Sequence, residues 1–196
     1  MIDVAIKKEV NDQQLSQALE IYYEAFKRKI KPLIKSKEIA CNVYKKSINK
    51  DRILYALAEE EVVGFVGLQY CGKNFMEIKY KTLREYMNPV KSFFVFLIYK
   101  KVLLPKIKTN EMRIDSLAVK SGYRSKGIGS KLINEVFLLS RNLGLSEIIL
   151  EVVNTNPKAK KLYEKIGFVE KKHVRYFFIT RKAGFTSEYI MSYKLN

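Results

Sequence analysis

A short glycine-bearing stretch is the first part of the sequence whose residue types could do chemistry. Residues 124–129 are Arg-Ser-Lys-Gly-Ile-Gly, between a strand-like run at Met112–Val119 and a helix-like run at Lys126–Asn142. A glycine turn that opens a helix gathers several backbone N–H groups at the positive end of the helix dipole. With the flanking cations Arg124 and Lys126, these donors favour a pyrophosphate. The motif alone is weak, because such turns also serve as tight turns and helix-packing sites.

A second motif lies further along the chain, at Asn156–Phe168. Asn156 is a capping residue, Pro157 takes the first helical position and Gly167 follows the last one, so this stretch predicts a short helix. Tyr163 lies on that helix. The residues alone predict a core position for Tyr163, on a helix face shared with Ala159 and Ile166.

The order and spacing of the two motifs make the chain resemble the GNAT superfamily of acetyl-CoA-dependent N-acetyltransferases. Arg124–Gly129 is similar to the pyrophosphate loop of that family, and Asn156–Phe168 is similar to its second cofactor motif. The chain has Ser121 and Ser125 where the family often has Pro and Gly, but serine still offers a backbone N–H. The resemblance implies an acyltransferase that uses acetyl-CoA as cosubstrate and transfers acetyl to a primary amine by direct attack in a ternary complex.

The same resemblance implies a set of cofactor-binding residues. Strand residues would pair with the pantetheine arm, loop amides would hold the pyrophosphate, and residues of the second motif would contact the cofactor from the other side. This set is Leu117, Ala118, Val119, Arg124, Ser125, Lys126, Gly127, Ile128, Gly129, Ser130, Asn156, Ala159 and Tyr163.

Two catalytic roles also follow from the resemblance. Tyr163 would act as general acid toward the leaving thiolate, and Glu151 would act as general base, as a glutamate does at this place in bacterial ribosomal-protein N-terminal acetyltransferases. A lone carboxylate inside the apolar strand Glu147–Val153 should also have a raised pKa. The alternative for Glu151 is an ion pair with a lysine. Asp115 is the second candidate base, on the face that a period-two count shares with Leu117 and Val119.

Composition limits the other classes of function. The chain has 37 Lys and Arg against 20 Asp and Glu, which gives a net charge of +17. We attribute this excess partly to a general lysine bias and partly to binding of an anionic ligand or partner. The single histidine, His173, excludes a multi-histidine metal site, and no metal is expected. Cys41 and Cys71 lack metal or redox spacing and indicate reduced structural thiols, so we expect a cytoplasmic location.

The pattern along the chain predicts one mixed α/β domain over residues 1–196. We expect an α/β (α+β) fold with a single mixed, mostly antiparallel central sheet, flanked by helices on both faces and with an inserted segment between strands 3 and 4. The insertion is residues 72–108, basic and apolar. The predicted strands are Val4–Ile6, Ile53–Ala58, Val62–Tyr70, Met112–Val119, Glu147–Val153, Val174–Thr180 and Glu188–Leu195. The predicted helices are a first amphipathic helix from Asn11 to Ile30, then Lys37–Ile48, Lys126–Asn142 and the helix of the second motif.

The sequence leaves the acceptor and the partners open. The acceptor is a protein N-terminus, a lysine or a small-molecule amine; a ribosomal protein and a homodimer also stay open, and no motif indicates a specific nucleic acid. Two further alternatives are a non-catalytic acyl-CoA-binding sensor and a ribosome- or nucleic-acid-associated basic protein. The apolar run Phe93–Tyr99 is too short to span a bilayer. It is interpreted as a packing helix or a lid, then as a dimer contact, and last as a membrane-surface element.

Overall fold

Seven strands form one sheet in the order β1-β2-β3-β4-β5-β7-β6. The computed structural model describes residues 3–100, 107–176, 180 and 183–195. Neighbouring strands are antiparallel except β4 and β5, which are parallel. The strands are β1 (Ala5–Lys7), β2 (Ile53–Ala58), β3 (Glu61–Gln69), β4 (Glu111–Val119), β5 (Glu147–Val153), β6 (Val169–Arg175) and β7 (Ser187–Lys194).

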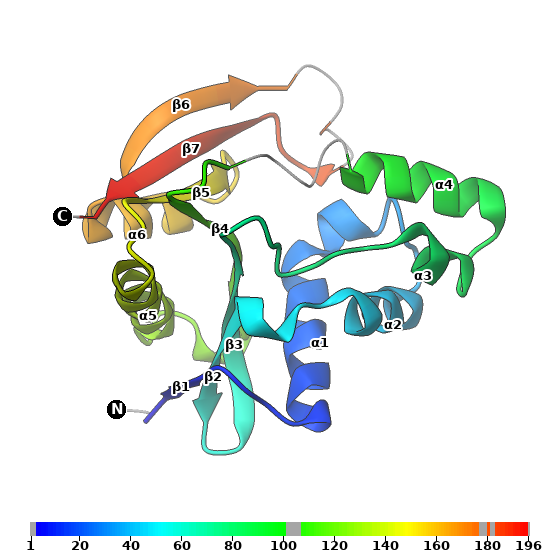
Figure 1. Cartoon of the computed structure of the whole chain (residues 1–196), viewed down its shortest axis with the longest axis horizontal. Coiled ribbons are helices and arrows are strands. Elements are labelled where there is room, and N and C mark those ends of the chain that lie inside the picture. Colours follow the sequence, from blue (N-terminus) through cyan, green and yellow to red (C-terminus); the bar gives the residue numbers. More distant parts are fainter. Residues whose placement is uncertain (1–2, 101–106, 177–179, 181–182, 196) are drawn as a thin grey trace.

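Helices cover both faces of this sheet (Figure 1). One face packs against α1 and α2, with α3 and α4 beyond them, and the other face packs against α5 and α6. The expected mostly antiparallel sheet with helices on both faces is therefore confirmed. The helices are α1 (Asp12–Ile30), α2 (Lys37–Ser47), α3 (Tyr80–Arg84), α4 (Pro89–Ile98), α5 (Ile128–Asn142) and α6 (Pro157–Ile166), with short 3-10 turns η1 (Lys50–Arg52) and η3 (Ser121–Tyr123).

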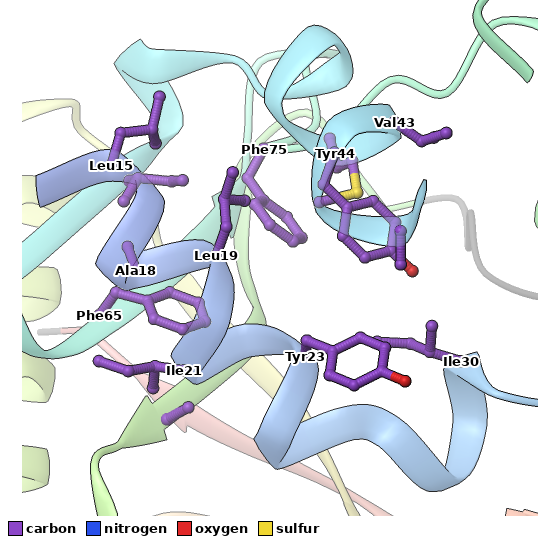
Figure 2. Packing of buried hydrophobic residues seen from close by; sticks show 14 of the residues in the cluster. Leu15, Ala18, Leu19, Ile21, Tyr23, Ile30, Val43, Tyr44, Phe65 and Phe75 are labelled. Carbon is purple, nitrogen blue, oxygen red and sulfur yellow. The ribbon is translucent and has the colours of Figure 1, made fainter. Parts of the chain in front are cut away.

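The central strands are apolar on both sides because both sides are covered. In β2, Tyr55 and Leu57 belong to the cluster under α1, whereas Leu54 and Ala56 belong to the cluster under α5. Figure 2 shows the first cluster, in which side chains of α1 and α2 meet Phe65 and residues of the insertion. The sheet therefore separates two cores, and a side chain on β4 or β5 belongs to one of them.

Local sequence signals explain the ends of the first helix. Asn11 caps α1 by accepting a hydrogen bond from Gln14 N at 2.9 Å, and the side-chain oxygen of Gln14 accepts one from Asn11 N at 3.1 Å. This capping box satisfies two donors that a helix start leaves free. Three cations lie in the last turn, before Pro32, where they oppose the negative end of the helix dipole.

The inserted segment between β3 and β4 is confirmed, and it contains α3 and α4. It is joined to the sheet at Gly67, where an added Cβ would lie 2.7 Å from the ring of Phe75. The expectation of a packing helix over Phe93–Tyr99 holds for one side of α4 only. Val95 and Tyr99 are buried, whereas Phe93 is exposed.

Some predicted bounds are wrong. The sixth strand is Val169–Arg175, not Val174–Thr180, and residues 177–179 lie outside the described residues. The helix predicted from Lys126 begins at Ile128, after a left-handed Gly127. None of the helices in the described ranges is both long and apolar enough to cross a membrane.

Candidate active site

Two parallel strands separate near their carboxyl ends. The last pair of the ladder between β4 and β5 is Ile114 with Leu150. β4 nevertheless continues to Val119, and β5 continues to Val153. The two strands therefore leave a gap within the sheet. Backbone polar groups that leave a ladder need new partners, so this gap is a place for a ligand with amide groups of its own.

The backbone of β4 presents hydrogen-bonding groups to this gap. Lys120 N donates to Val63 O of β3 at 2.8 Å, and Val119 lies opposite Gly64 in the same antiparallel ladder. Successive N–H groups of a strand point to alternate sides, so the N–H groups of Leu117 and Val119 point away from β3 and toward the gap. Both residues belong to the predicted cofactor-binding set.

The prediction that Asp115 and Leu117 share a face of β4 is wrong. Consecutive residues of β3 pair with Ser116 and Ile114, so the ladder skips Asp115. Such a bulge adds one residue to a strand and shifts its alternation. Asp115 therefore lies on the α1 face, close to Tyr22 of α1. Burial raises the pKa of Tyr22, and neighbouring groups that include the Asp115 carboxylate raise it further. Leu117 packs instead in the cluster on the α5 face.

Three charged side chains form a connected cluster on the α1 face of the gap. Arg113 Nη2 lies 2.7 Å from Glu151 Oε2, and Arg113 Nη1 lies 3.7 Å from Asp115 Oδ1. The side chain of Arg113 is 8% exposed, against 27% for Glu151 and 23% for Asp115. The hydroxyl of Ser116 also donates to Asp115 Oδ2 at 3.0 Å. One buried guanidinium thus holds both candidate bases.

Burial decides the electrostatics of this cluster. Removal from water raises the pKa of Glu151, and the charge of Arg113 opposes the rise without cancelling it. Burial likewise raises the pKa of Asp115 against the effect of Arg113. The raised pKa expected for Glu151 is therefore confirmed, and its ion pair is with an arginine. A carboxylate with a raised pKa is a better proton acceptor when it is ionised.

The loop between β4 and α5 has the backbone of an anion site. Ser125 has φ 61° and Gly127 has φ 80°, both in the left-handed region. A Cβ added at Gly127 would meet no atom within 4 Å, so the loop faces open space there. The following helix, α5, has 15 residues, and its first N–H groups are free of intrahelical partners. These features fit a bound pyrophosphate.

Side chains fasten this loop to the strands beside it. Arg124 Nε donates to Val119 O at 3.1 Å, at the edge of the gap. Tyr123 donates to Glu61 of β3 at 2.8 Å, and Lys120 forms an ion pair with the same carboxylate. These contacts with β3 and β4 fix the geometry of the loop before any ligand binds, which reduces the entropy lost when an anion binds.

Tyr163 lies on the other face of the sheet from Glu151. Its ring is 7% exposed and packs against Phe168, with ring centroids 5.9 Å apart. Burial raises its pKa to about 12. Within the described residues its hydroxyl makes no hydrogen bond, and it is not among the side-chain atoms shut off from solvent. The ring is thus a core element, and the hydroxyl is free to donate.

The remaining residues of the second motif bring α6 to the loop. Asn156 caps α6 by accepting from Ala159 N at 3.2 Å. A Cβ added at Gly129 would lie 3.5 Å from Leu162 of α6 and 3.8 Å from Leu117 of β4. The pyrophosphate-type loop, the open edge of β4 and the helix of Tyr163 therefore meet at one point.

The sequence model of the Acetyltransferase (GNAT) family matches residues 15–168. The chain belongs to this family. Acetyl-CoA is the acyl donor of the family, and the residues described above fit it. The left-handed loop and helix start suit its pyrophosphate, and the open edge of β4 suits the amides of its pantetheine arm.

Individual relatives match this GNAT chain over limited segments. N-alpha-acetyltransferase 30 of Xenopus laevis is 43% identical over 65 residues, which are 33% of this chain and 24% of that protein. The chain therefore spans about a quarter of the length of this relative.

Solved structures match most of the chain. N-acetyltransferase from Staphylococcus aureus Mu50 has a TM-score of 0.67 at 17% identity, covering 96% of this chain and 100% of that one. An acetyltransferase from Bacillus anthracis str. Ames in complex with acetyl coenzyme A has a TM-score of 0.51 at 22% identity, covering 79% of this chain and 69% of that one. At these identities the likeness shows the fold.

Arg113 was not predicted from the sequence, although its guanidinium contacts both candidate bases. The residue lies inside a strand of mostly apolar neighbours, Met112 and Ile114, and a buried arginine needs carboxylate partners. That signal was present, but pairing it with Glu151 requires knowing that β4 and β5 are neighbours.

Proposed function

We propose that this chain transfers an acetyl group from acetyl-CoA to a primary amine, by direct attack of the amine in a ternary complex. The observation that supports the proposal most is the gap that β4 and β5 leave beyond Ile114 and Leu150, with Glu151 on the α1 face of the sheet and Tyr163 in the cluster on its α5 face. A base can approach the amine from the α1 face while a donor approaches the leaving sulfur from the α5 face.

Acetyl-CoA supplies the thioester that the amine attacks. We assign Leu117, Ala118 and Val119 to its pantetheine arm. The N–H groups of Leu117 and Val119 face the arm, Ala118 joins them along the strand, and Val119 N–H polarises the thioester carbonyl. Its pyrophosphate is assigned to the loop and to the first residues of α5. The loop residues are Arg124, Ser125, Lys126 and Gly127, and those of α5 are Ile128, Gly129 and Ser130. Asn156 and Ala159 of α6 complete the cofactor side.

Glu151 takes a proton from the ammonium form of the acceptor, directly or through water. Its ion pair with Arg113 at 2.7 Å fixes the orientation of the carboxylate. Asp115 is the alternative base on the same face. The deprotonated amine then attacks, and the amide forms as the bond to sulfur breaks.

Tyr163 stabilises the leaving thiolate chiefly as a hydrogen-bond donor. Its pKa is raised to about 12, whereas an ordinary thiol has a pKa of about 8.5. Complete proton transfer from the phenol to the thiolate would be uphill by about 3 to 4 pKa units. Donating a hydrogen bond without transferring the proton avoids this cost and still stabilises the negative charge that develops on the sulfur.

The acceptor we place first is the α-amino group of a polypeptide. The chain is 43% identical to N-alpha-acetyltransferase 30 over 65 residues, and that name denotes acetylation at an α-amino nitrogen. An α-ammonium group has a pKa of about 8 and a lysine of about 10.4. A carboxylate base therefore deprotonates the α-amine at a cost lower by about 3 kcal/mol.

The test is release of free CoA thiol from acetyl-CoA with three acceptors: a peptide with a free N-terminus and no lysine, an N-acetylated peptide with one lysine, and a polyamine. We expect turnover with the first and a loss of at least about tenfold in kcat for Tyr163→Phe, with unchanged acetyl-CoA affinity. Turnover with the lysine peptide or the polyamine alone would replace the α-amino group as the proposed acceptor. Tight acetyl-CoA binding with no turnover on any amine would favour the non-catalytic sensor instead.

A further inference from the structure

The outer side of α4 carries an apolar stripe that the proposed acetyl transfer does not use. Val90, Phe93, Phe94 and Ile98 follow one another at helical spacing, and they are 67%, 51%, 58% and 38% exposed. The opposite side of the helix holds the buried Val95. Exposing several large apolar side chains together is unfavourable in water, so a contiguous stripe of this kind marks a contact surface.

A groove runs beside this stripe and continues into a basic region. A cavity of about 580 Å³, open to solvent, is lined by Val90, Phe94 and Ile98 of α4 and by Pro32 and Leu33 after α1. Pro32 also lines a second cavity, of about 390 Å³, whose other walls are Lys27, Arg28 and Lys31. The surface is thus apolar on one side and cationic on the other.

No acidic residue occurs in either segment that builds this surface. Residues 25–37 and 86–100 contain lysines and an arginine but no Asp or Glu, and within the described residues the neighbouring Glu24 pairs only with Lys27, at 3.0 Å. Lys91 and the exposed Lys100 add charge from α4 and its C-terminal end. A second copy of the chain would bring these cations against their own counterparts, which is repulsive. The charge therefore indicates an anionic occupant.

From this combination we propose that α4 and the end of α1 dock onto an anionic lipid surface. Figure 1 shows α4 at the outer edge of the helical layer, where a flat surface can reach it. Phe93 lies outside the groove, so the apolar stripe extends past any groove-bound peptide. Aromatic side chains on a short helix with lysines around them are the pattern of a helix that lies in the headgroup region.

The absence of tryptophan from the chain gives a sharp test. We would make Phe93→Trp and, as matched control, Leu138→Trp on α5, where Leu138 is 52% exposed. Each variant is titrated with vesicles of phosphatidylcholine alone and of phosphatidylcholine mixed with phosphatidylglycerol. We expect a blue shift of tryptophan emission for Phe93→Trp with the mixed vesicles only, weakened by added salt, and none for Leu138→Trp.

A co-sedimentation experiment with the same vesicles separates the apolar contribution from the charge. Phe93→Ser with Phe94→Ser should lower the partition coefficient at least about tenfold, and Lys31→Gln with Lys91→Gln should weaken binding to the mixed vesicles. Leu138→Ser with Val169→Ser, two exposed apolar residues elsewhere, should change nothing. Equal blue shifts for both tryptophans, or no binding to mixed vesicles, would overturn the proposal. If the protein does not bind vesicles and its mass in solution is that of a dimer, the apolar stripe is instead covered by a second copy of the chain.

Discussion

Arg113 is the residue on which the proposed acid–base chemistry depends most. It lies between the two carboxylates, is 8% exposed and has two nitrogens, Nε and Nη1, without hydrogen bonds in the described part of the chain. Its charge keeps the raised pKa of Glu151 from rising further. We regard it as a positioning residue that acts through Glu151.

Arg113→Gln should therefore move the rising limb of the pH profile of kcat/KM to higher pH, because Glu151 would lose the cation that favours its ionised form. Arg113→Lys should move it less. The free energy of unfolding should fall by roughly 2–4 kcal/mol on loss of the buried partner. Arg141→Gln, at the exposed end of α5, is the control. An unmoved limb in Arg113→Gln would remove Glu151 as the base.

The buried carboxyl group of Asp115 should make the stability of the folded protein depend on pH. Burial raises its pKa in the folded protein, so the folded state holds this proton more tightly than the unfolded state. The folded protein therefore loses stability as pH rises from the unfolded pKa through the raised folded one. Asp115→Asn removes that loss and should gain stability relative to the native protein between pH 4 and pH 7, as measured by urea unfolding. A difference that is independent of pH would contradict the raised pKa.

The loop before α5 combines a left-handed glycine with the proposed pyrophosphate site. Gly127 and Gly144 both have positive φ, and a Cβ added at either meets open space. Gly127→Ala and Gly144→Ala should each cost roughly 1 kcal/mol of folding free energy. Only Gly127→Ala should also weaken acetyl-CoA binding in calorimetry. Equal affinities in the two variants would place the pyrophosphate elsewhere.

The elements differ in how far the sequence predicts them, and burial explains the difference. β2 was predicted because a strand buried on both faces is apolar along its length. β5 was predicted from a similar apolar run, although its residues are alternately half-buried and buried. β6 is one of the two edge strands and is exposed on nearly all its residues. It therefore has no apolar alternation, and the more apolar run after it was predicted instead.

The bulge in β4 is the reason why one part of the site was predicted wrongly. Period-two counting assumes an unbroken ladder, and the one skipped residue, Asp115, moves every later side chain to the other face. The loop and the second motif were predictable because each is a contiguous stretch of chain. The cluster around Arg113 was not, because its members come from two strands that only the fold makes neighbours.

At the scale of the whole molecule, the sheet keeps two kinds of chemistry apart. The face under α1 holds the carboxylates and Arg113, and the face under α5 holds Tyr163 and the start of the proposed anion site. A net charge of +17 attracts an anionic donor from a distance. The carboxylates beside the gap are a local exception that favours an amine. The gap between β4 and β5 is where these two regions meet.

The most direct test is a titration of the isotope-labelled protein with acetyl-CoA, followed by the amide signals in NMR. We expect saturable shifts, one ligand per chain, at residues 124–130 and at Leu117 and Val119, whose N–H groups point toward the gap. The amide of Ala118, which points to β3, should shift much less. Shifts spread over the lysine-rich surface, with none at Leu117 and Val119, would contradict a cofactor site between β4 and β5.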